Sequence, residues 1–169
     1  MLKIKNYNKE NGLTMIELIV AIGIFGLVVG MVVGIFMLSI ISQRRIIALR
    51  NVEDNVRFTT ESIAREIRTG VNFSGGGSML SFINASGQSV IYRLNSNAIE
   101  KSVNGGSTYS AVTGSEITVN YLSFYLAGQA LGDGLQPRVT IVMGVTSQVG
   151  NQTANLKVQT TISERLLQS

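Results

Sequence analysis

The sequence contains no cysteine and no histidine. These absences exclude disulfides, thiolate and imidazole metal sites, cysteine nucleophiles and histidine-based catalytic triads. An exported domain of this chain must therefore be held together by its hydrophobic core. Only two aspartates are present, one of them in the Gly-Asp-Gly stretch at residues 132–134, which is too few oxygen ligands to favour calcium. Because no nucleophile–base pair is visible either, we expect no enzyme, no metal and no cofactor.

The basic excess of the chain is small and unevenly placed. The formal net charge is +4 and the isoelectric point is about 9.6. Half of that charge comes from Lys3, Lys5 and Lys9, offset by Glu10, before residue 13. No basic cluster of the kind that binds nucleic acid is left in the remainder, so the sequence does not favour a nucleic-acid partner.

A long apolar run, residues 13–41, follows this basic head and is interrupted only by Thr14, Glu17 and Ser39. As a helix it would extend about 43 Å, and a bilayer core needs about 20 residues. A secretory signal peptide has an apolar core of only about 7–15 residues and a small-residue cleavage site, which is missing here. The run therefore predicts a membrane-spanning helix, although a plain anchor would leave Glu17 unexplained.

Glu17 is a carboxylate inside this predicted span. An ionised carboxylate at the centre of a spanning helix costs about 2.5–3.5 kcal/mol, and such residues are usually functional. In one interpretation Glu17 reaches the lipid headgroups; in the other it awaits a cation. A cut before Leu13 would create an α-amino group at the same depth, which could pair with Glu17 of a neighbouring chain.

Basic residues on the two sides of the run balance each other. Three precede it and three follow it: Lys3, Lys5, Lys9 and Arg44, Arg45, Arg50. The rule that basic flanks stay in the cytoplasm therefore leaves the orientation open.

Residues 12–18, Gly-Leu-Thr-Met-Ile-Glu-Leu, resemble the class III signal of type IV pilins and type II secretion pseudopilins. In that signal a basic leader ends in Gly, an apolar residue follows, Thr or Ser is commonly second and Glu is fifth. Gly12, Leu13, Thr14 and Glu17 match position by position. The resemblance implies that a membrane prepilin peptidase removes residues 1–12 and methylates the new amine of Leu13.

The same resemblance implies where the protein acts and with what. The N-terminus would lie in the cytoplasm, the span in the inner membrane and the C-terminal domain outside, before assembly into a filament at the cell surface or in the periplasm. The implied partners are other pilin or pseudopilin subunits, prepilin peptidase, an inner-membrane assembly-platform protein and membrane lipid before assembly, with no small-molecule substrate. The alternatives are a major pilin and a membrane-tethered binding module that does not assemble.

Four glycines mark the predicted span, and major type IVa pilins often have proline where this chain has Gly34. The four are Gly23, Gly26, Gly30 and Gly34. Small residues at four-residue spacing let membrane helices pack closely. Each glycine also weakens a helix by about 1 kcal/mol relative to alanine. We therefore expect helix packing, flexibility or both.

Helical periodicity continues through residues 42–70, which predicts one helix over residues 13–69 that ends before Gly70. The expected buried stripe comprises Leu49, Val52, Val56, Ile63 and Ile67. A charged ladder at i,i+4 spacing is expected on another face: Glu53, Arg57, Glu61 and Arg65.

Short strands are predicted beyond residue 78, after a flexible Ser-Gly-Gly-Gly-Ser connector at residues 74–78. The expected strands are residues 79–84, 88–94, 97–103, 116–128, 138–146 and 154–166. Residues 128–137 are expected to form a loop, and residues 147–153 a hairpin loop. A helix followed by antiparallel strands is an α+β arrangement, here with residues 71–169 forming the sheet part of the globular domain.

This order is similar to that of J-type minor pseudopilins and W-type minor pilins. The similarity rests on the helix end at residues 64–70 and on residues 89–103, Ser-Val-Ile-Tyr-Arg-Leu through Lys-Ser-Val, where Lys101 replaces the usual Arg. It implies a pilin fold, in which a long N-terminal helix is transmembrane in its first half, amphipathic in its second, and packed on a C-terminal antiparallel sheet. It also implies a minor subunit.

Overall fold

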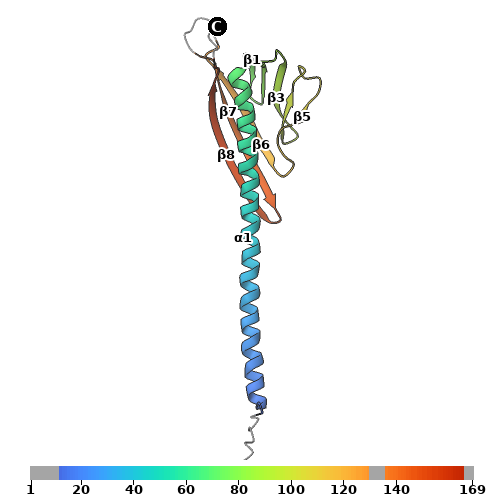
Figure 1. Ribbon diagram of the computed structural model, residues 1–169, viewed down its shortest axis with the longest axis vertical. Coiled ribbons are helices and arrows are strands. Elements are labelled where there is room, and N and C mark those ends of the chain that lie inside the picture. The colour runs from blue at the N-terminus through green and yellow to red at the C-terminus, as the bar shows by residue number, and fades with distance from the viewer. Residues whose placement is uncertain (1–11, 130–135, 166–169) are drawn as a thin grey trace, which may run out of the picture. The chain divides into compact units, whose positions relative to one another are not determined.

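The computed structural model describes residues 12–129 and 136–165. Within these residues one long helix, α1 (Met15–Thr69), precedes antiparallel strands, which confirms the predicted α+β, pilin-like fold (Figure 1). The chain divides into two compact units, Met1–Ser42 and Gln43–Ser169. The second unit contains the strands and the C-terminal part of α1, which packs on them.

Helix α1 ends where the sequence predicts. The Gly70 N–H donates a hydrogen bond to the Ile67 carbonyl oxygen at 3.2 Å, which closes the last turn. A Cβ atom at Gly70 would lie 2.6 Å from the Phe82 ring. Glycine at this position therefore lets the chain pass closely over the Phe82 ring where the helix ends.

The buried stripe of α1 is only partly the predicted one. Leu49 is 42% exposed, and Ala48 is fully buried instead. Thr59 is buried as well, although the apolar pattern did not predict it. Residues 48, 52, 56, 59, 63 and 67 follow 4–4–3–4–4 spacing, which keeps one face of a 3.6-residue helix toward the sheet. Leu49 was predicted to be buried because it is large and apolar, but its position lies about 100° around the helix from Ala48.

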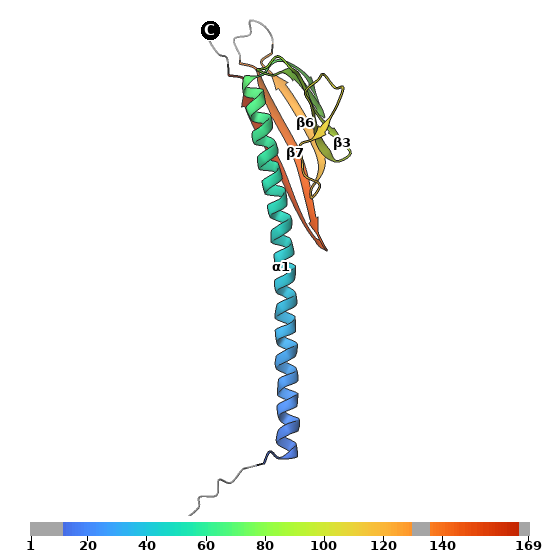
Figure 2. The same ribbon diagram turned by 45° about the vertical axis from the view of Figure 1, so that its right-hand side comes forward.

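The strands form two antiparallel sheets rather than the single expected one. The five-stranded sheet has the order β1 (Val71–Gly76), β2 (Met79–Ile83), β3 (Ser89–Asn95), β4 (Ala98–Ser102) and β5 (Ser110–Ala111). The three-stranded sheet has the order β6 (Thr118–Ala127), β7 (Arg138–Val149) and β8 (Gln152–Ser163). Each strand pairs with its sequence neighbour, so both sheets are meanders (Figure 2).

The sequence predicts a flexible connector at residues 74–78, but this prediction is wrong. The segment is ordered. Gly75 and Gly76 end β1, and Gly77 forms an antiparallel bridge with Phe124 of β6. Gly77 N–H donates to the Phe124 oxygen at 3.1 Å, and Phe124 N–H donates to the Gly77 oxygen at 2.7 Å. The three consecutive glycines have φ of 101°, 137° and 61°, a conformation that other residues rarely adopt. This segment joins the two sheets.

The β7–β8 hairpin is longer than predicted, so the loop expected at residues 147–153 is wrong. Val149 pairs with Gln152, which leaves a two-residue turn at Gly150 and Asn151. Gly150 has a φ of 60°, which suits glycine at such a turn. The Gly-Asp-Gly stretch, considered for calcium, and the lysines of the basic head lie outside the described residues.

One hydrophobic core joins the helix to both sheets. Its largest fully buried side chains come from α1 and from strands of each sheet: Tyr92, Phe82, Phe124, Ile63, Ile67 and Leu80. Alternating burial along β2 and β3 shows that one face of the five-stranded sheet packs inward.

Candidate processing and assembly site

The start of α1 is capped by Thr14. Its Oγ1 accepts a hydrogen bond from the Glu17 N–H at 3.3 Å, and its carbonyl oxygen accepts one from the Leu18 N–H at 3.1 Å. This pattern makes Thr14 the N-cap, so the helix begins at Met15, two residues after the predicted start at Leu13. Thr14 and Glu17 were both predicted as assembly residues, but the cap was not predicted. The Thr-x-x-Glu spacing of a capping box was the signal for it.

The peptide bond between Gly12 and Leu13 precedes the helix. Both residues lack regular secondary structure, both are exposed, and the Leu13 side chain is 73% exposed. A Cβ atom added at Gly12 would meet nothing within 4 Å. The bond is therefore accessible and not protected by helical hydrogen bonds, as a peptidase substrate must be.

Glu17 lies in the first turn of α1. A negative charge there is favourable because the helix dipole is positive at this end, by about 0.3–1 kcal/mol. Among residues 12–129 and 136–165, its carboxylate makes no ion pair within 4.0 Å. Its backbone N–H is thus held by the Thr14 side chain.

The four glycines predicted for packing or flexibility all lie within α1, which stays helical through Gly34. Gly26, Gly30 and Gly34 follow one another at four-residue spacing and so lie along one face of the helix. A Cβ atom built at any of the four would meet nothing within 4 Å. The backbone is therefore open to a close neighbour along this face.

The side chains that surround this site are apolar and exposed. Among the described residues, α1 is the one helix long and apolar enough to cross a membrane, judged by length and composition. Phe25, Leu27 and Ile35 are each more than 60% exposed. Surface of this kind is stable in lipid or against other apolar helices, not in water.

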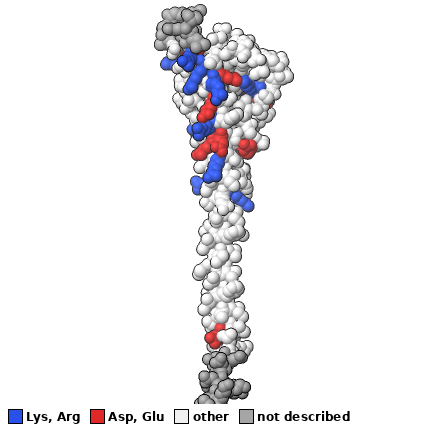
Figure 3. Space-filling view, in the orientation of Figure 1, with Lys and Arg blue, Asp and Glu red and all other residues white. Residues whose placement is uncertain are grey.

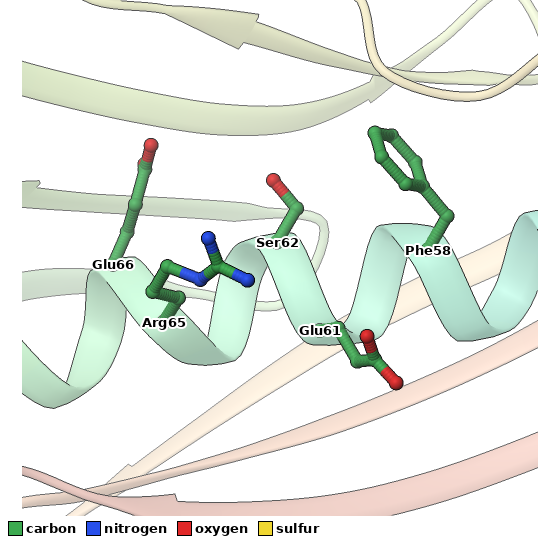
Figure 4. A pocket seen from close by; sticks show the side chains of 5 residues that line it. All are labelled: Phe58, Glu61, Ser62, Arg65 and Glu66. Carbon is green, nitrogen blue, oxygen red and sulfur yellow. The ribbon is translucent and has the colours of Figure 1, made fainter.

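Pockets on the globular unit are the alternative candidate sites. One of about 260 Å³ is lined by residues of α1: Phe58, Glu61, Ser62, Arg65 and Glu66. Phe58, Ser62 and Glu66 project to the same side of the helix, away from Glu61 (Figure 4). Both carboxylates are already engaged, since Glu61 pairs with Arg57 at 3.0 Å, and Glu66 is bound by two groups of the sheet.

Glu66 ties α1 to the five-stranded sheet. Its Oε2 accepts a hydrogen bond from the Tyr92 hydroxyl at 2.9 Å, and its Oε1 pairs with Lys101. Burial, and secondarily the Glu66 charge, raise the pKa of Tyr92 above its usual range. These contacts hold the helix on the sheet and give the pocket a structural explanation. The charged ladder predicted on α1 contributes one ion pair within 4.0 Å in the described residues, Arg57–Glu61.

The capped start and the exposed Gly12–Leu13 bond thus precede a helix that is long and apolar enough to cross a membrane. Residues 7–33 match the family described as the prokaryotic N-terminal methylation motif. The motif indicates a pilin- or pseudopilin-type protein that is processed by prepilin peptidase and interacts with other pilin subunits. No curated protein and no solved structure matches the chain.

Proposed function

We propose that this protein is a minor pilin or pseudopilin, a structural subunit of a type IV pilus or of a type II secretion-like filament. The observation that carries the proposal is the juxtaposition of an exposed Gly12–Leu13 bond, Glu17 in a helix start capped by Thr14, and an exposed apolar helix, within the matched methylation motif. The segments at residues 64–70 and 89–103 support the J-type or W-type branch by their similarity to it. Gly34, in place of the frequent proline of major pilins, supports a minor role.

Processing creates the charge that assembly needs. Cleavage after Gly12 releases the α-amino group of Leu13, which prepilin peptidase then methylates. The residues before the cut stay in the cytoplasm, and the globular unit lies on the other side of the membrane. The new cation is the α-amino group of Leu13, which precedes the N-cap Thr14. After cleavage, the nearest carboxylate in the same chain is that of Glu17, which lies within the helix.

Glu17 neutralises the Leu13 amine of a neighbouring subunit. A lone carboxylate in the apolar helix is costly, and removal of that cost by pairing favours an ordered insertion of each new subunit. The Gly26–Gly30–Gly34 face lets neighbouring helices approach closely enough for the pair to form. Before assembly the subunit is stored as a single-pass membrane protein.

The pairing is tested by Glu17→Ala. Loss of the pair should lower incorporation into filaments at least tenfold, which corresponds to about 1.4 kcal/mol, while removal of the leader continues. Sheared filaments are quantified by immunoblot, and cleavage is followed by intact mass. The matched control is Glu53→Ala, an exposed glutamate of the same helix, which should assemble normally. Normal assembly of Glu17→Ala would remove the proposed role.

The cleavage is tested by Gly12→Leu. A bulky side chain beside the scissile bond should block the peptidase, so the chain keeps residues 1–12 and its mass stays that of the precursor. Terminal sequencing also separates the filament subunit from a tethered binding module. A chain that begins at N-methylated Leu13 supports the filament subunit, and a retained leader in the natural sequence supports the module.

A further inference from the structure

The end of the globular unit that adjoins the apolar run is basic and has no acidic residue. Arg44, Arg45 and Arg50 follow the run directly, and Lys157 lies on β8. Residues 18–52 and 138–163 contain no Asp or Glu at all. In Figure 3 the charged side chains at the lower end of the domain are blue, and the red ones lie above them.

The β7–β8 hairpin reaches this basic end. The turn residue Gly150 lies against Arg44, because a Cβ atom added there would be 3.0 Å from the Arg44 Nη1 and 3.4 Å from its Cδ. Arg45 and Leu49 of α1 line a groove of about 250 Å³ with residues 153–155 of β8. The hairpin tip and the two arginines therefore form one surface, which we call the hairpin-tip surface.

Chain length keeps this surface close to the membrane. Ile41 ends the apolar run and Arg44 is three residues later, so their Cα atoms lie at most about 11 Å apart. The hairpin tip lies against the Arg44 side chain, so it too stays near the end of the run. If the C-terminal end of residues 13–41 lies at the membrane surface, chain length therefore places the hairpin-tip surface close to the headgroups.

Arginines at this place run against the usual charge distribution. With the leader in the cytoplasm, Arg44, Arg45 and Arg50 lie on the far side of the membrane, where basic residues next to a span are depleted. No ion pair of the described residues involves them, since those pairs join Arg57–Glu61, Arg93–Glu100 and Lys101–Glu66. An anionic partner at headgroup depth would account for both facts.

We propose that the hairpin-tip surface docks on anionic phospholipid headgroups of the outer leaflet, with Arg44 and Arg45 binding phosphate and the β7–β8 turn seated beside them. The proposal rests on the proposed topology of the pilin-type anchor. Guanidinium groups bind phosphate oxygens through paired N–H donors. Docking holds the stored subunit against the membrane until assembly extracts it. The free energy needed for extraction therefore increases with the negative charge of the lipids.

The test uses the full chain in vesicles. Because the chain has no cysteine, Asn151→Cys gives one fluorophore site at the hairpin tip. Vesicles of phosphatidylcholine, alone or with about one third phosphatidylglycerol, carry a headgroup spin label as quencher in both leaflets. We expect stronger quenching with phosphatidylglycerol, and its loss at about 0.5 M salt, where the screening length is a few ångströms.

Two arginine variants sharpen the test. Each basic residue near an anionic surface strengthens association about fivefold, so Arg44→Gln/Arg45→Gln should weaken docking roughly thirtyfold and remove the lipid dependence. The matched control is Arg65→Gln/Arg68→Gln, which removes the same charge near the other end of the domain's helix and should leave quenching unchanged. A label at Ser163→Cys, at the far end of β8, should be quenched weakly in every vesicle.

The outcomes separate docking from the anchor. Quenching that does not depend on phosphatidylglycerol, or that persists in Arg44→Gln/Arg45→Gln, would refute the contact with lipid. The arginines would then be expected to bind carboxylates of a neighbouring subunit. An alkaline carbonate wash reports on the anchor separately. Protein that stays in the vesicles but shows no lipid-dependent quenching refutes docking alone. Protein released by the wash refutes the membrane anchor and the docking with it.

Discussion

The two ends of α1 have similar side chains and opposite surroundings. Ile24 is 58% exposed, whereas Ile63 of the same helix is fully buried against the strands. Both isoleucines lie in the same helix, so helical structure alone does not determine whether they are buried. The C-terminal part buries its apolar side chains in the core of its own domain, whereas the N-terminal part leaves them exposed, for lipid or other subunits under the proposed function.

Polar groups differ between the same two regions. In the domain, Glu66 receives a hydrogen bond from Tyr92 and an ion pair from Lys101. In the apolar segment, Glu17 has its backbone fixed by Thr14 and no cation within 4.0 Å among the described residues. The Glu66 contacts stabilise the domain, whereas the proposed role of Glu17 is to bind a second subunit. Under that proposal, the C-terminal part of the helix serves folding and the N-terminal part serves assembly.

The largest expected effect comes from the same substitution at the two isoleucines. Ile63→Ala removes a fully buried side chain and should lower the free energy of unfolding of the domain by about 2–5 kcal/mol. Ile24→Ala removes no buried contact within the chain and should change it by less than about 0.5 kcal/mol. Urea unfolding of the full chain in detergent micelles, followed by tyrosine near-ultraviolet circular dichroism, measures both. Equal losses would show that the apolar segment is part of the domain's core.

The main elements of this contrast could be predicted from the sequence because they rest on long, regular patterns. The apolar run, the end of the helix at Gly70 and most of the strands have clear periodicity or a clear breaker. The candidate site was likewise found from the spacing of Gly12, Leu13 and Glu17, since processing signals are read locally. Its cap at Thr14 followed the same local pattern but was overlooked.

The errors arose where tertiary contacts override local preference. Residues 74–78 have the composition of a loose linker, yet the Gly77–Phe124 bridge orders them. Leu49 fits a helical stripe by hydrophobicity, but the sheet lies opposite Ala48. The Arg44–Gly150 contact joins residues more than a hundred positions apart, and no local pattern could reveal it. Such features depend on which surfaces meet after folding.

A second prediction concerns pH and the Glu66 contact of the domain. Because the folded state raises the pKa of Tyr92 above its usual value near 10, its stabilising contribution is complete below pH 10 and is lost above it. The unfolded chain releases the tyrosine proton first, so the free energy of unfolding should fall by about 2 kcal/mol between pH 10 and 11.5. Urea unfolding at each pH measures the slope.

Two tyrosine variants identify the source of that slope. Tyr92→Phe removes the ionisable group and should flatten the alkaline loss. The control, Tyr125→Phe, changes a residue that is 61% exposed and should keep the slope of the natural chain. An unchanged slope in Tyr92→Phe would show that the alkaline loss arises elsewhere.

The smallest effect is also the one whose sign differs between the two regions. Gly144 of β7 is paired with Tyr121 of β6, and a Cβ atom there would overlap the tyrosine ring. Gly144→Ala forces the ring aside and should destabilise the domain by about 1–2 kcal/mol. Gly30→Ala meets nothing within 4 Å and should stabilise the helix by about 1 kcal/mol, since alanine is the better helix former.

Unfolding of the domain measures the effect of Gly144→Ala. Hydrogen exchange of the apolar segment in micelles measures the effect of Gly30→Ala. Tyr121→Leu supplies the control, because a shorter side chain should make Gly144→Ala nearly neutral. If Gly30 serves close helix packing, Gly30→Ala should slow exchange in the isolated subunit and yet lower incorporation into filaments. Slower exchange with normal incorporation would instead favour flexibility as the reason for glycine, so this variant decides between the two interpretations.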